Sequence, residues 1–212
     1  MLSEVRTGPI LSSDGAVNVA RAGRFGELLT NDAVGKYYQA AVDGRLFMAS
    51  MQATAVTGTA LTATAITFTL WNPPSSNVNL SVVSGNVNVG VLQTTTGNIP
   101  TYVWAANVNP AAAVPATNTE IVVRSGLLGG AVGKGIVFSA TTLPAVPIII
   151  RLFPLATACT ATTQLAEVAL AAVDHVDGAI VIAPNTAVTI QGIATTTQIS
   201  AFIGMTWIEV PI

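Results

Sequence analysis

From Leu46 to Thr119 the chain carries no charged residue, and apolar side chains alternate there with Thr, Asn and Ser. Alternation with a period of two places successive side chains on opposite faces of an extended strand. Residues 66–71 read Ile-Thr-Phe-Thr-Leu-Trp, and residues 78–82 and 87–91 alternate in the same way. A stretch of this length and pattern predicts an all-β domain, because a helix would require apolar residues three and four positions apart.

Similar segments recur to the end of the sequence, separated by Gly, Pro, Asn and Ser at spacings typical of sandwiches and barrels. We expect further strands at 101–105, 119–124, 135–140, 146–153, 179–183, 187–193 and 199–210. Residues 164–172 fit a helix or a strand equally, and residues 31–42 are the one strong helical candidate. The sequence therefore predicts an antiparallel β-sandwich, with a jelly roll as the favoured topology.

The charged residues are concentrated at the beginning of the sequence. Ten of them lie within the first 45 residues, where Asp43-Gly44 is also a turn signal. We therefore expect an extended or partly helical N-terminal arm at 1–45, followed by a β-sandwich domain at 46–212.

Charged residues make up only 8% of the 212 residues, while hydrophobic residues make up 51%. Soluble domains usually contain about 25% charged residues. A surface with so few charges favours association, because little repels a neighbouring copy. We expect a homo-oligomer, with a trimer as the favoured form. The longest apolar run, 143–150, contains two prolines and is too short to cross a membrane, so we expect a buried strand and no membrane partner.

The glycine-rich run 129–135 matches the pattern of a phosphate-binding loop only in part. Such a loop requires Gly where this chain has Leu128, and Ser or Thr where it has Gly135. We therefore interpret the run as a turn. The net charge of −2 and the eight Lys and Arg residues also argue against a nucleic-acid partner.

Potential metal ligands cluster at one place, Asp174, His175 and Asp177. The carboxylates could bind calcium, and the imidazole could bind a transition metal. Asp177-Gly178 before an apolar segment is equally a hairpin turn, which we favour, so we expect no metal and no cofactor. His175 is the only histidine and no Gly-x-Ser-x-Gly motif accompanies it, so we expect no enzyme activity.

Three motifs carry a resemblance to a known family. They are Gly-Lys-Tyr-Tyr-Gln-Ala at 35–40 with Asp-Gly-Arg-Leu-Phe at 43–47, Phe-Thr-Leu-Trp-Asn-Pro at 68–73, and the closing segment 202–212. From Gly23 onward the chain resembles a family of tailed-bacteriophage virion structural proteins. The resemblance implies a place in the virion, with capsid decoration (cement) protein or head fibre as the role, and it implies no chemistry.

We favour a capsid decoration protein on the capsid surface, which stabilises the shell by apolar packing against itself and the major capsid protein. The alternative is a host-receptor-binding module at a fibre or spike tip, which needs a groove lined by aromatic and amide side chains.

Two groups of residues are candidate contacts in this setting. Arg21, Arg24 and Phe25 form either a solvated turn or a docking contact to another capsid protein. Trp71, Trp104 and Trp207 could form a sugar-binding platform, but on alternating strands we favour core or interface anchors.

Overall fold

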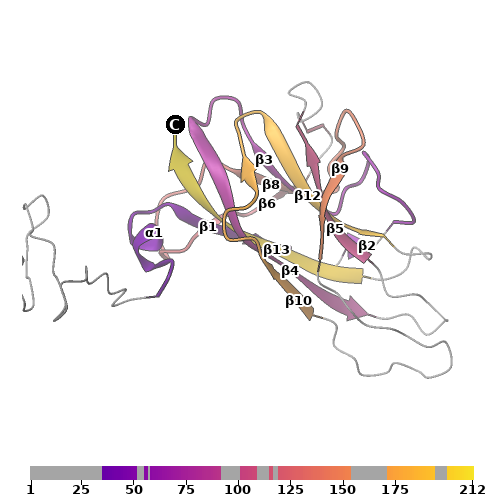
Figure 1. Ribbon diagram of the computed structural model, residues 1–212, viewed down its shortest axis with the longest axis horizontal. Coiled ribbons are helices and arrows are strands. Elements are labelled where there is room, and N and C mark those ends of the chain that lie inside the picture. Colours follow the sequence, from indigo (N-terminus) through magenta and orange to yellow (C-terminus); the bar gives the residue numbers. More distant parts are fainter. Residues whose placement is uncertain are drawn as a thin grey trace, which may run out of the picture. The chain divides into compact units, whose positions relative to one another are not determined.

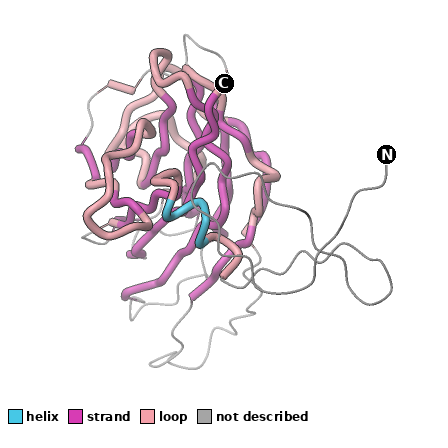
Figure 2. Tube along the Cα trace, turned by 90° about the vertical axis from the view of Figure 1, so that its left-hand side faces the viewer, coloured by secondary structure: helices cyan, strands magenta, loops and turns pink. Residues whose placement is uncertain are grey.

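The computed structural model of the chain describes residues 35–51, 55–56, 58–91, 101–108, 115–116, 119–153, 171–193 and 200–212. Within these ranges strands predominate, and the one helix is a short segment (Figure 2). The elements are α1 (Tyr38–Val42), β1 (Leu46–Ser50), β2 (Ala55–Val56), β3 (Phe68–Asn72), β4 (Val78–Val91), β5 (Thr101–Asn107), β6 (Thr119–Ile121), β7 (Arg124–Ser125), β8 (Ile136–Ser139), β9 (Ile148–Leu152), β10 (Ala171–His175), β11 (Val181–Ile182), β12 (Thr186–Ile193) and β13 (Ser200–Pro211).

The strands form two antiparallel sheets that pack against each other (Figure 1). One sheet has the order β10-β4-β13-β1-β7, with β11 added to β4 and β2 added to β13. The other has the order β6-β8-β3-β12-β5-β9. The predicted all-β sandwich is confirmed.

Eight strands form two four-stranded groups, β1-β13-β4-β10 and β3-β12-β5-β9. A jelly roll contains two facing sheets of four strands each, so these two groups within the larger sheets are compatible with the jelly roll that the sequence favours. That topology stays a prediction.

Alternating residues of both sheets point inward and make one core. Its largest fully buried side chains include Trp104 on β5 and Trp207 on β13. β13 lies between β4 and β1, and its inward residues Ala201, Ile203 and Met205 are almost completely buried. Burial of apolar area at about 25 cal/mol per Å² is the main stabilising contribution to such a core.

The central strands of the six-stranded sheet, β3, β12 and β5, are also buried on their outer face, where polar side chains are covered by the chain's own loops. Gln191 on β12 accepts a hydrogen bond from the Thr62 backbone N–H (3.2 Å) and donates one to the Thr62 carbonyl (3.2 Å). Asn107 on β5 donates to the carbonyl of Ala145 (3.0 Å). These bonds satisfy side chains that would otherwise be costly to bury.

Several element boundaries differ from the sequence-based expectation. Residues 78–91 form one continuous strand rather than two, with an irregular register opposite Thr206 and Trp207. The helix expected at 31–42 covers only Tyr38–Val42 among the described residues. The sequence did not predict the separate strands β1, β2, β7 and β10. β10 includes the end of the segment 164–172, which fits a helix or a strand equally.

The chain divides into two units, 1–38 and 39–212. Residues 1–34 lie outside the described residues, so the expected arm at 1–45 stays a prediction. Both sheets lie within the second unit.

Candidate interaction surface

Most of the apolar segment 143–150 is exposed, contrary to the expectation that it is a buried strand; only Leu143 and Pro147 are buried. All five β9 residues are exposed, and the four apolar ones have 44–71% of their surface accessible. The pairing of Ala106 with Ile148 continues β5 and β9 toward Val108 and Val146, which are also exposed. We call this set the β9 surface: Val108, Val146, Ile148, Ile149, Ile150 and Leu152. An exposed cluster of large apolar residues marks a site of interaction more often than a solvated face.

The only charged residue on β9, Arg151, forms an ion pair inside the molecule. Its Nη2 and Nε donate to Oδ1 and Oδ2 of Asp174, at 2.7 and 2.8 Å. Asp174 is 3% exposed and also accepts a bond from Trp104 Nε1 to Oδ2 (2.8 Å). The hydrogen bonds from Arg151 to this carboxylate raise the pKa of the guanidinium above its ordinary value. Arg151 is therefore paired within the chain, although 42% of its side chain remains exposed.

This ion pair connects the two sheets at one edge of the sandwich. β9 is the last strand of the six-stranded sheet, and β10, which carries Asp174, is the last strand of the other. The ring of Phe153 stacks on Trp104, with centroids 5.2 Å apart and an interplanar angle of 8°. The edge is thus held by a bidentate charged contact and a stacked aromatic pair.

The backbone of β9 is poorly suited to adding another strand. Its register with β5 is irregular between Trp104 and Ala105, and Arg151 points inward. Bulges and inward-pointing charges are both devices that blunt a sheet edge. A partner at this edge would therefore contact side chains rather than extend the sheet.

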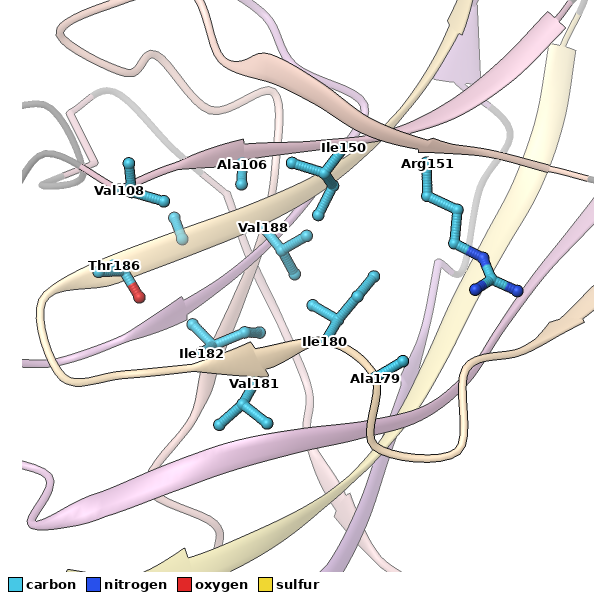
Figure 3. A pocket seen from close by; sticks show the side chains of 11 residues that line it. Ala106, Val108, Ile150, Arg151, Ala179, Ile180, Val181, Ile182, Thr186 and Val188 are labelled. Carbon is cyan, nitrogen blue, oxygen red and sulfur yellow. The ribbon is translucent and has the colours of Figure 1, made fainter.

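A hollow of about 370 Å³ lies beside the β9 surface, between β9, β12 and β11. Ile150, Ile180, Ile182 and Val188 point toward one another around it, and Arg151 lies at one end (Figure 3). The hollow is mainly apolar, and its one charged lining residue is already paired with Asp174.

The three potential metal ligands do not converge. Asp174 is occupied by Arg151 and Trp104, while His175 and Asp177 are exposed. Asp177 and Gly178 both have positive φ angles, as in a tight turn. No group of three or more His, Cys, Asp or Glu side chains is close enough to hold a metal ion in the part of the chain that the structure describes.

The glycine-rich run 129–135 binds a carboxylate of the protein itself. The backbone N–H groups of Lys134 and Gly135 donate to Glu209 Oε1, at 2.6 and 2.9 Å. Glu209 is buried on β13, so these two donors satisfy a charge inside the sandwich. Successive N–H groups in such a turn do attract an anion, and here the anion is internal.

The tryptophans predicted as interface candidates are mainly core residues. Trp104 and Trp207 have no exposed surface, so neither contacts a partner or a sugar in this structure. Trp71 is half-buried beside Phe138, with ring centroids 6.4 Å apart. Arg21, Arg24 and Phe25 lie outside the described residues.

Sequence reasoning missed both the exposure of β9 and the pairing of Arg151 with Asp174. One signal was present in the sequence, because each of these residues is a lone charge within an apolar strand. A charge that is buried must be paired, but the sequence alone does not show which charges become neighbours.

No helix among the described residues is both long and apolar enough to cross a membrane. Comparisons of the chain with protein-family models, with curated proteins and with solved structures found no match.

Proposed function

We propose that this chain is a structural subunit of a virus particle, a capsid decoration protein that stabilises the shell through apolar contacts with copies of itself and with the major capsid protein. The observation that carries the proposal is the β9 surface, a set of exposed apolar side chains on and beside an edge strand whose one charge, Arg151, is paired with Asp174 although 42% of its side chain is exposed. The virion context is supported by the sequence motifs described above.

The energetic argument is that this surface is costly to leave in water. Each 100 Å² of apolar area that a partner covers contributes about 2.5 kcal/mol before the costs of association. Since the chain has few charges, little electrostatic repulsion opposes a neighbouring copy.

The alternative, a host-receptor-binding module, receives less support from the same features. An aromatic sugar platform would need exposed tryptophans, whereas Trp104 and Trp207 are buried. The hollow beside β9 is lined by aliphatic rather than aromatic and amide side chains.

The first test is the oligomeric state of the full chain at micromolar concentration, measured by sedimentation velocity. We expect an oligomer, and we expect the double variant Ile148→Lys with Leu152→Lys to dissociate it, because two ammonium groups would be buried in the contact. Val210→Lys, at an exposed apolar position of β13, is the matched control and should remain oligomeric. A monomeric wild-type chain would contradict self-assembly.

The second test concerns the place of the chain in the particle. Cryo-electron microscopy of particles that contain the chain should show it on the outer surface of the shell, in contact with the major capsid protein. Density for the chain only at a fibre tip would favour the receptor-binding alternative instead.

A further inference from the structure

The connection between β7 and β8, residues 126–135, crosses from one sheet to the other without joining a strand. Its middle part, 127–132, is exposed at every residue. Its last part, 133–135, has the sequence Gly-Lys-Gly and lies against the core. We call residues 133–135 the strap.

The strap contacts core side chains of both sheets. A Cβ added at Gly135 would be 2.9 Å from Cδ1 of Leu80 and 3.2 Å from Nε1 of Trp207. It would be 3.3 Å from Cδ1 of Leu70. Leu80 and Trp207 belong to the seven-stranded sheet and Leu70 to the six-stranded one, and all three are fully buried. The strap therefore covers the core where the two sheets meet beside Trp207.

The strap approaches the core so closely that its first residue also has no room for a side chain. A Cβ added at Gly133 would be 2.9 Å from Oε1 of Glu209 and 3.0 Å from Cδ1 of Phe47. Contacts as short as these require a neighbouring atom to move. Glycine at 133 and 135 is thus what allows the backbone to lie on the core.

One carboxylate holds the strap in place. The N–H groups of Lys134 and Gly135 both donate to Oε1 of Glu209, at 2.6 and 2.9 Å. Glu209 is buried on β13, where its cross-strand neighbour is Leu80. Hydrogen bonds to a charged acceptor are stronger than those between neutral groups, so Glu209 is a strong attachment point for the strap.

The rest of the strap contributes little to its own stability. It has no apolar side chain to bury, since two of its residues are glycines and Lys134 is exposed. The exposed residues 127–132 precede it, and the paired strand β8 begins directly after it at Ile136. A segment with few buried side chains that lies outside the sheets opens at a lower free energy than the sheets themselves.

The indole of Trp207 also favours opening. Its Nε1 is buried and has no hydrogen-bond partner in the described part of the chain. A buried donor without an acceptor is costly, and access of water through an open strap would satisfy it.

We infer that the strap opens and closes independently of the two sheets, and that Glu209 is the positioning residue that holds it closed over Trp207. Opening exposes the indole N–H together with Leu70 and Leu80. The device is built into the fold and requires no partner, so the inference goes beyond the proposed function.

The test is amide hydrogen exchange of the full chain. In the wild type, the amides of residues 134 and 135 should exchange faster than those at the centre of β13, with little dependence on denaturant, because local opening exposes little surface. Glu209→Ala should speed the exchange of these two amides about tenfold or more, as loss of a charged acceptor does. Glu209→Gln keeps an oxygen acceptor and should restore most of the protection.

Two further variants separate local opening from general destabilisation. Gly133→Ala leaves the carboxylate in place but pushes the strap away from Phe47, so it should also speed exchange at 134 and 135 and replaces Glu209→Ala if that variant does not fold. Asp174→Ala is the control, because Asp174 lies on β10 at the other end of the sheet from β7. It should leave exchange at 134 and 135 unchanged.

Two results would overturn the inference. One is that the amides at 134 and 135 exchange as slowly as the centre of β13 in the wild type and in Glu209→Ala, since the strap would then open only when the whole chain unfolds. The other is that Asp174→Ala speeds them as much as Glu209→Ala does. These exchange rates do not measure association, so neither result bears on the proposed assembly.

Discussion

Asp174 shows how one buried charge can organise several neighbours. Its carboxylate accepts hydrogen bonds from Trp104 Nε1 and from Nε and Nη2 of Arg151. Trp104 belongs to the six-stranded sheet and Asp174 to the other, so the carboxylate connects the two layers. Because this contact uses the only charge of β9, it also leaves the outside of that strand apolar.

We expect Asp174→Ala to destabilise the fold measurably. Trp104 Nε1 would remain buried without an acceptor, which costs about 1–3 kcal/mol. Asp43→Ala removes a second ion pair, between Asp43 and Arg45 (2.6 Å), and is the matched control. That pair is exposed, and the hydrogen bonds from Arg45 and Gln39 lower the pKa of Asp43 at the surface, so its loss should leave the melting temperature essentially unchanged. Equal melting temperatures for the two variants would contradict the connecting role of Asp174.

At the scale of elements, the alternating segments of the sequence predicted most strands, because burial of one face requires period-two alternation. The sequence did not predict that 148–152 is exposed, since an apolar run is the same whether its own fold or a partner covers it. It also divided β4 at Gly85, where Ser-Gly-Asn at 84–86 indicated a turn or a bulge; the strand continues, and its register with β13 is irregular between Val82 and Ser84. The structure gives another reason for that glycine.

Gly85 on β4 is needed because Trp104 lies against it. A Cβ added at this position would be 2.4 Å from Cζ2 of the indole. The ring cannot move easily, because it is fully buried, stacked on Phe153 and bonded to Asp174, the cross-strand neighbour of Gly85. We therefore expect Gly85→Ala to lower the free energy of unfolding by about 1–3 kcal/mol, as overpacking does.

The control for this substitution is Gly35→Ala, where an added Cβ meets no atom within 4 Å. Chemical denaturation of the two variants provides the comparison. Equal midpoints would show that the Trp104 ring adjusts without cost.

For the whole molecule, the sequence predicted association from composition, and the structure adds where apolar side chains are exposed. Composition could not locate them, because it does not distinguish an apolar residue of the core from one on the surface.

Self-association should therefore resist salt. Charged contacts weaken as the Debye length falls from about 10 Å at 0.1 M to about 3 Å at 1 M ionic strength. A contact through the β9 surface would bury no unpaired charge from β9, because Arg151 is paired with Asp174, and apolar contacts are strengthened by salts such as sulfate. We expect the dissociation constant from sedimentation to stay constant or fall when sodium sulfate is added. A steep rise in the dissociation constant with sodium chloride would show that charges, and not the apolar surfaces, hold the copies together.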